Sequence, residues 1–212
     1  MNTEMLVFII EIIGTVAFAS SGAMIGIRKK MDIFGVIVMA VMTAVGGGII
    51  RDLVLGIHPP NTFKDPIYVE YSVATAVILF VIFYVRKQML DSKAMFYYEK
   101  IMILLDAIGL GAFTVIGVET AYGIGFVHHR FLLLFVGVIT GVGGGMIRDM
   151  MAQQIPFILV KQIYACASLI GAGVCIWLMP YHKSVSMILG AVVVVIIRIL
   201  AATYRWDLPK ID

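Results

Sequence analysis

The residues of this chain best suited to chemistry or transport belong to one motif, Gly-Gly-Gly-x-x-Arg-Asp, which occurs twice. The first copy comprises Gly46, Gly47, Gly48, Arg51 and Asp52, and the second comprises Gly143, Gly144, Gly145, Arg148 and Asp149. Both copies lie inside long apolar runs. Glycine weakens a helix by roughly 1 kcal/mol per residue relative to alanine, and ionised side chains are costly inside a membrane. The doubled combination therefore indicates a functional or architectural feature.

Two interpretations of the glycine triplets are open. A triplet permits two helices to cross closely, or it permits a kink or a short unwound segment. Unwound backbone at membrane depth is tolerated only where protein or water covers it. Because a triplet stands in each half of the chain, three residues before an Arg-Asp pair, we favour broken helices that line a water-filled path.

The charged residues of the motif are sequence neighbours, and neighbours on a helix do not face each other. Each arginine is therefore expected to seek an aspartate elsewhere. The repeat offers one in the opposite copy, so the hypothesis pairs Arg51 with Asp149 and Arg148 with Asp52.

Three further ionisable residues are candidates for a pore or a gate. Glu11 and Asp106 stand in the middle of apolar runs, where acids usually face a bundle interior or an aqueous cavity. Either acid could attract cations or bind a proton, or it could be a protonated group hydrogen-bonded to a neighbouring helix. Lys161 either extends to lipid headgroups or lies near Asp149 and gates an inner mouth. Ser21, Thr43 and Thr140 are expected to bond to their own helix backbones.

Enzyme chemistry is not expected. The sequence has no nucleophile elbow, phosphate-binding loop or metalloprotease motif. Its histidines lack the spacing to acids or thiols that a metal site requires, so neither a metal nor a cofactor is predicted. A net charge of +3 gives no reason to expect a nucleic-acid partner.

The composition is that of a polytopic membrane protein whose partner is the lipid bilayer. Hydrophobic residues make up 61% of the 212 residues and charged residues only 14%, against about 25% charged residues in a soluble domain. A spanning helix needs about 20 mostly apolar residues. Seven segments qualify or nearly qualify, at 5–27, 33–56, 67–85, 101–118, 131–152, 162–179 and 184–204. The fold class predicted is an all-α membrane protein with seven transmembrane helices.

Lysine and arginine set the predicted orientation, because cytoplasmic loops carry the excess of both. The loops after the first, third, fifth and seventh segments hold ten of these residues, and the loops on the other side hold three. We therefore expect the N-terminus outside and the C-terminus in the cytoplasm.

The repeat extends beyond the motif. A shift of 97 residues superposes the two motifs, and also Pro59 on Pro156. The chain is thus predicted to be a single transmembrane domain, with one repeat at about 5–88, a second at about 101–180 and an extra helix at about 184–204. Three spans per unit make the second unit enter the membrane inverted. Small residues every four positions, Ala40, Ala44 and Gly48 and then Gly137, Gly141 and Gly145, predict close helix packing.

Two such motifs, on the second and fifth spans of a seven-span chain, resemble the prokaryotic branch of the trimeric intracellular cation channels. Bacterial relatives of that family often carry the label "glycine transporter domain". The resemblance implies a homotrimer with one pore per protomer, conducting monovalent cations, chiefly potassium, and kinked at the two triplets. The Lys-Glu-Val segment of animal members is absent, so phosphoinositide binding is not expected. Their long polar tail is also absent, which fits a prokaryotic source and hence a location in the inner membrane.

The leading functional hypothesis is a potassium-permeable channel. The alternative is a secondary transporter of a small solute such as glycine, because inverted repeats with broken helices serve alternating access equally well.

Overall fold

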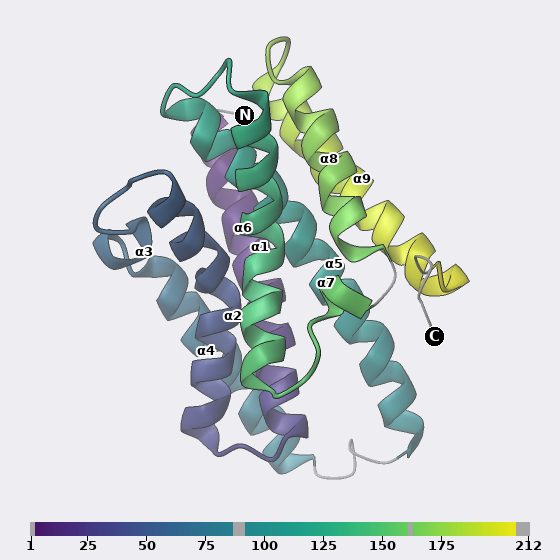
Figure 1. The fold of residues 1–212 in the computed structure, drawn as a ribbon. Helices are drawn as coiled ribbons and strands as arrows, with labels where there is room; N and C mark the ends of the chain where they lie inside the picture. The colour runs from purple at the N-terminus through teal and green to yellow at the C-terminus, as the bar shows by residue number, and fades with distance from the viewer. Residues whose placement is uncertain (1–2, 87–91, 161–162, 207–212) are drawn as a thin grey trace.

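The structure is a computed structural model that describes residues 3–86, 92–160 and 163–206, and its regular elements there are all helices. The long helices are α1 (Thr3–Arg28), α2 (Ile33–Val54), α4 (Ile67–Val85), α5 (Ser92–Gly123), α6 (Arg130–Met151) and α9 (Lys183–Tyr204). The shorter ones are α3 (Asn61–Lys64), α7 (Phe157–Val160) and α8 (Tyr164–Leu178). Helices α1, α2, α4, α5 and α6 run alternately down and up in Figure 1, and α8 runs up before α9 returns downward. The protein is an all-helical membrane protein, as predicted.

Six helices in the described ranges are long and apolar enough to cross a membrane. The predicted sixth span corresponds to α8, which has only 15 residues. Such a helix is about 22 Å long, less than the roughly 30 Å of a bilayer core. Seven crossings therefore remain a prediction. The fourth span was predicted too short, because α5 continues to Gly123.

The helices pack as two similar groups. Helices α1, α2 and α4 contact one another, and α5, α6 and α8 do the same. The groups meet where α1 packs on α5 and α2 packs on α6, while α9 lies against α5 and α8 (Figure 1). Each group has the order long, long, short, then one further helix. This order agrees with the 97-residue repeat read from the sequence.

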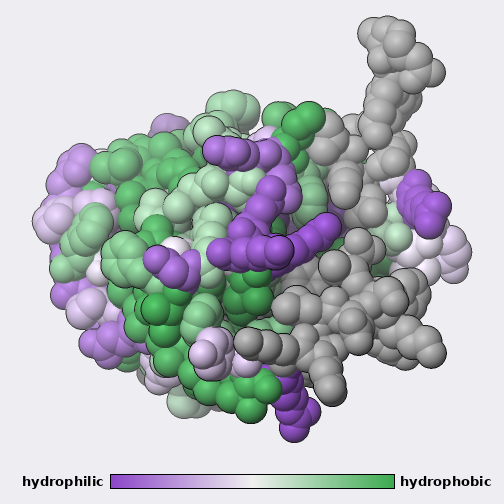
Figure 2. Space-filling model, turned by 90° about the horizontal axis from the view of Figure 1, so that it is seen from below, coloured by the Kyte–Doolittle hydropathy of each residue, from purple (hydrophilic) through white to green (hydrophobic). Residues whose placement is uncertain are grey.

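Large apolar side chains cover the flanks of the bundle. Trp177, Phe131 and Val85 are among the most exposed of these. Seen from below, one group of hydrophilic residues lies near the middle of the face, and others lie along its left edge, with hydrophobic residues between them (Figure 2). At the end of α1, Arg28 and the two lysines that follow it are exposed. An apolar flank with charged ends suits a bundle embedded in lipid.

Both glycine triplets lie in uninterrupted helix, so the expected unwound segment is not present. The middle glycine of each triplet has a packing role instead. A Cβ added to Gly47 would overlap with the carbonyl oxygen of Thr140, and one added to Gly144 would overlap with that of Thr43. Helices α2 and α6 therefore cross backbone to backbone at the triplets, which is the close-crossing interpretation that the sequence left open.

The small-residue stripe of α6 does pack closely, but its partner is α5 and not α2. A Cβ on Gly137 would lie 3.1 Å from the carbonyl oxygen of Thr114, and one on Gly141 would lie 3.1 Å from that of Leu110. The stripe of α6 thus faces α5, and the contact between α2 and α6 depends on the middle glycines.

Candidate functional site

The two motifs end their helices in the same way. Beyond the first, Leu55 N–H donates to the Arg51 carbonyl at 2.9 Å and Ile57 N–H donates to the Asp52 carbonyl at 2.8 Å. The residues 97 positions later repeat both bonds, from the N–H groups of Ala152 and Gln154, at 3.0 and 2.9 Å. A left-handed residue completes each turn, Gly56 with φ +72° and Gln153 with φ 54°. Both helix ends thus use the common left-handed termination.

Each motif aspartate also holds the start of the short helix that follows. Asp52 Oδ2 accepts the N–H of Asn61, the first residue of α3, at 2.7 Å. Asp149 Oδ2 accepts the N–H of Phe157, the first residue of α7, at 2.9 Å. The first residues of a helix have no intrahelical partner for their N–H groups. The sequence explains a one-residue offset between the copies, because Pro60, the counterpart of Phe157, has no N–H to donate.

The predicted cross-pairing of the motif charges is wrong. Arg51 Nε lies 2.8 Å from Oδ1 of its own neighbour Asp52. Arg148 Nε likewise lies 2.9 Å from Asp149 Oδ1. The rule that adjacent helical residues diverge fails at a helix end, because the long arginine side chain turns back beside the terminal carboxylate.

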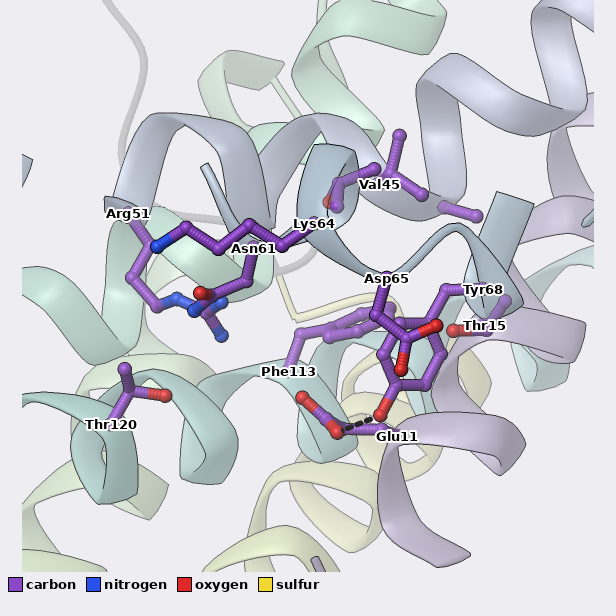
Figure 3. A pocket seen from close by; sticks show the side chains of 13 residues that line it. Glu11, Thr15, Val45, Arg51, Asn61, Lys64, Asp65, Tyr68, Phe113 and Thr120 are labelled. Atoms are coloured by element: carbon purple, nitrogen blue, oxygen red, sulfur yellow. Dashed lines mark hydrogen bonds between the residues drawn. The ribbon is translucent and has the colours of Figure 1, made fainter. Parts of the chain in front are cut away.

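The first arginine lies beside a cavity of about 310 Å³. Helices α1, α2, α4 and α5 and the α3 segment form its walls. Arg51 and Lys64 lie on one side of the cavity, whereas Glu11 and Asp65 lie on the other (Figure 3). Asp65 is exposed and Glu11 half-buried. Both signs of charge therefore face one space large enough for hydrated ions or a small solute.

Glu11 is oriented by Tyr68 of α4, whose hydroxyl donates a hydrogen bond to Glu11 Oε2 (Figure 3). This pair joins α1 to α4 at the cavity wall. Glu11 also lines a second cavity of about 470 Å³, which includes Glu119 and Lys183. Lys183 Nζ and Glu119 Oε1 are 2.6 Å apart there. Glu11 thus lines two cavities, as the first interpretation expects, and has a hydrogen bond to a neighbouring helix, as the second expects.

The second arginine is enclosed by protein. Arg148 is fully buried and binds three side chains: Nη1 lies 2.6 Å from Asp106 Oδ1, the same Nη1 donates to Ser21, and Asp149 accepts from Nε. The Phe157 ring centroid is 5.5 Å from its Cζ. We call Arg148, Asp106, Asp149 and Ser21 the inner cluster. It draws residues from α1, α5 and α6, and it places the interior acid Asp106 in an ion pair.

The remaining predicted residues divide in three ways. Thr43 and Thr140 bond to their own helices, at the carbonyls of Met39 and Val136, as expected. Ser21 was expected to do the same, yet it binds Arg148 of another helix. Lys161 lies outside the described residues, so its predicted role at an inner mouth stays a prediction. The described chain holds no cluster of histidines, cysteines and acids able to bind a metal.

Sequence reasoning missed Tyr68 and the short helices α3 and α7. Tyr68 stands in the first turn of an apolar helix, where a tyrosine usually marks the membrane interface. The one available signal for the short helices was a pair of equivalent prolines, Pro59 and Pro156, which follow the two motifs at the same distance.

Comparison with known proteins agrees with this architecture. A family model described as "Glycine transporter" matches residues 8–84 and 103–180, one range in each half. The inner membrane protein YadS of Escherichia coli (strain K12) is 39% identical over 209 residues, which cover 97% of this chain and 96% of YadS. A prokaryotic TRIC channel crystallised in 0.5 M KCl superposes with a TM-score of 0.86 and 33% identity, over 97% of this chain and 100% of the channel.

The chain belongs to the trimeric intracellular cation channel family. The orthologue of this family from Rhodobacter sphaeroides is 30% identical, with a TM-score of 0.81 over 93% of this chain and 97% of that one. Like YadS, this family member is a multi-pass protein of the inner membrane. The family model is described as a transporter, and the similar solved structures are of cation channels. These matches confirm the prediction that the chain is not an enzyme.

Proposed function

We propose that this protein is a channel for monovalent cations, potassium among them, with one pore in each protomer. The observation that carries the proposal is the cavity that Glu11 and Arg51 share among α1, α2, α4 and α5. Carboxylates that face such a cavity attract cations, and fixed ion pairs and hydrogen bonds hold the surrounding charges in place. The solved structures that this chain resembles are of cation channels. Permeant cations are the only ligands that the proposal requires.

In this proposal the described conformation is closed. Arg148 occupies the space between Ser21, Asp106 and Asp149, so a cation that entered from the cavity would meet a buried guanidinium. Opening would require the inner cluster to separate. The glycine triplets are the weakest points of α2 and α6, and we propose that these pore-lining helices kink there in the conducting state.

The proposed assembly is a homotrimer, with the inverted arrangement of the two helix groups and α8 as a seventh crossing. The proposed orientation places the N-terminus outside and the C-terminus in the cytoplasm. The excess of lysine and arginine in the loops on one side supports this orientation.

Recordings in planar lipid bilayers test the channel proposal. Wild-type protein should give unitary currents in symmetric KCl. Glu11→Gln should reduce unitary conductance several-fold at low salt, where a single carboxylate most raises the local cation concentration. The control is Glu70→Gln, which removes an exposed acid outside the cavity. Equal conductance in the two variants would contradict a role for Glu11.

The alternative function is a carrier for a zwitterion such as glycine. The separation of Arg51 and Lys64 from Glu11 and Asp65 across one cavity favours it (Figure 3), because such a site pairs a carboxylate and an ammonium group at once. The family model bears the same description. Absence of unitary currents, together with saturable, ion-coupled uptake of radiolabelled glycine into proteoliposomes, would establish the carrier.

A further inference from the structure

One face of α1 joins the cavity to the inner cluster. Glu11, Thr15, Phe18 and Ser21 follow one another at intervals of four, three and three, which places them along a single helix face. Glu11 and Thr15 line the cavity, and Ser21 binds Arg148. Ten residues separate the ends of this face, about 15 Å along the helix axis.

One face of α5 makes the same connection in the opposite direction. Thr120, Phe113 and Asp106 are seven residues apart, two helical turns each, and so share a face. Thr120 and Phe113 line the cavity, whereas Asp106 binds Arg148. Helix α5 packs on α1. Both faces therefore run from the same cavity to the same buried cluster.

Two aromatic rings occupy the middle of this route. The ring centroids of Phe18 and Phe113 are 5.3 Å apart, tilted by 41°. Phe18 is 1% exposed and Phe113 is 8% exposed. A Cβ added to Gly144 would lie 3.2 Å from the Phe18 ring, and one added to Gly109 would overlap with it. Phe18 therefore fills the space between α1, α5 and α6, one turn from Ser21.

The glycine crossing leaves no alternative route at this level between α2 and α6. Their backbones touch at Gly47 and Gly144, so an ion cannot pass between these two helices without separating them. Phe113 lines the cavity (Figure 3), and its ring packs against that of Phe18, which does not line the cavity. The two rings therefore lie between the cavity that Phe113 lines and the cluster that Ser21 and Asp106 help to form.

We infer that Phe18 and Phe113 form the hydrophobic constriction of the pore, with the Phe113 ring on the cavity side. The inference rests on the proposed channel function. An apolar constriction of this kind blocks ions because it removes water from the path. Removal of the Phe113 ring would let water pass from the cavity to Ser21.

Cysteine accessibility tests the constriction without requiring a current. In a background lacking Cys166 and Cys175, the two free thiols, reporter cysteines are placed at Thr15→Cys and Ser21→Cys. A small cationic methanethiosulfonate added from the cavity side should label position 15 readily. Labelling of position 21 should be slow and should become at least tenfold faster with Phe113→Ala.

Matched variants distinguish the loss of the Phe113 ring from a general loosening of the helix bundle. Phe113→Leu keeps an apolar side chain on the path and should leave position 21 protected. Phe135→Ala removes a phenylalanine that is 45% exposed on the bundle surface and should also leave it protected. Unchanged labelling of position 21 in Phe113→Ala, or a rise of equal size in Phe135→Ala, would overturn the inference.

Bilayer recordings of the same variants separate the two proposals. Phe113→Ala should raise open probability at least threefold, and Phe113→Trp should lower it. Faster labelling of position 21 without any wild-type current would keep the barrier and refute the channel. Wild-type currents with no effect of Phe113→Ala on labelling or opening would keep the channel and refute the constriction.

Discussion

The two arginines of the repeated motif have matching backbone surroundings and different side-chain surroundings. Arg51 and Arg148 each pair with the next aspartate, and each aspartate holds the N–H at the start of a short helix. Yet Arg51 lines an open cavity, whereas Arg148 is fully enclosed. The same motif thus places an arginine that is 7% exposed beside a cavity in one half, and a fully buried arginine in an ion cluster in the other.

The reason lies in two positions outside the motif. Arg148 binds Asp106 and Ser21, and the 97-residue shift relates these positions to Ile9 and Val118. The first half therefore offers apolar groups where the second half offers a carboxylate and a hydroxyl. Two polar side chains are enough to draw Arg148 into the bundle and enclose it. The comparison teaches that the motif sets local geometry and that residues outside the motif decide how far each arginine is enclosed.

The largest expected difference is in stability. Arg148→Met should lower the free energy of unfolding by about 3–5 kcal/mol, because it leaves Asp106 and Asp149 buried without their cation. Arg51→Met should cost less, about 1–3 kcal/mol, since Asp52 keeps its bond to Asn61 and a cavity adjoins Arg51. Thermal unfolding in detergent measures both. Equal losses of unfolding free energy in the two variants would refute the distinction between the cavity beside Arg51 and the enclosed site of Arg148.

The next effect tests the crossing that both halves share. Gly47→Ala should destabilise the protein by about 3 kcal/mol, the upper part of the range for overpacking, because its Cβ meets backbone that cannot move aside. Gly48→Ala is the control within the same triplet, since its nearest neighbour would be an Arg51 nitrogen at 3.8 Å. That substitution should stabilise the helix by up to about 1 kcal/mol. Similar unfolding temperatures for the two variants would rule out the tight crossing.

A third test concerns the charge of the two aspartates. Asp149→Asn keeps an oxygen for the Phe157 N–H but weakens the hold on Arg148, so open probability in bilayers should rise about tenfold, equivalent to about 1.4 kcal/mol. Asp52→Asn makes the same change beside the cavity and should leave open probability within about twofold. A larger change in open probability with Asp52→Asn would place the gate in the first half and contradict the proposed role of the inner cluster.

The smallest effect is expected at the rim. Lys183 and Glu119 lie 2.6 Å apart, with the lysine side chain 37% exposed. Lys183→Met should change the free energy of unfolding by less than about 1 kcal/mol, as is usual for exposed ion pairs. High salt should abolish any difference from wild type. A loss as large as that of Arg148→Met would show that this pair is sealed from water.

The sequence by itself determined the long helices, the repeated motif and the place of the charges within it. Apolar runs of spanning length, interrupted by short polar loops, leave a chain in lipid little choice but helix. The family could likewise be recognised from the doubled motif, because its residues lie close together in the chain. Even the start of the fifth span, predicted at 131, differs from the observed Arg130 by one residue.

Only the tertiary structure decided what each of these features touches. Arg148 and Ser21 are 127 residues apart, and no local rule reports which helix faces are brought together. For the same reason the triplets proved to be contact points in unbroken helices, and Phe18 and Phe113 emerged as a barrier only after α1 and α5 were placed side by side. Hydropathy and helix propensity act along the chain, whereas ion pairs, glycine contacts and ring packing depend on distances across it.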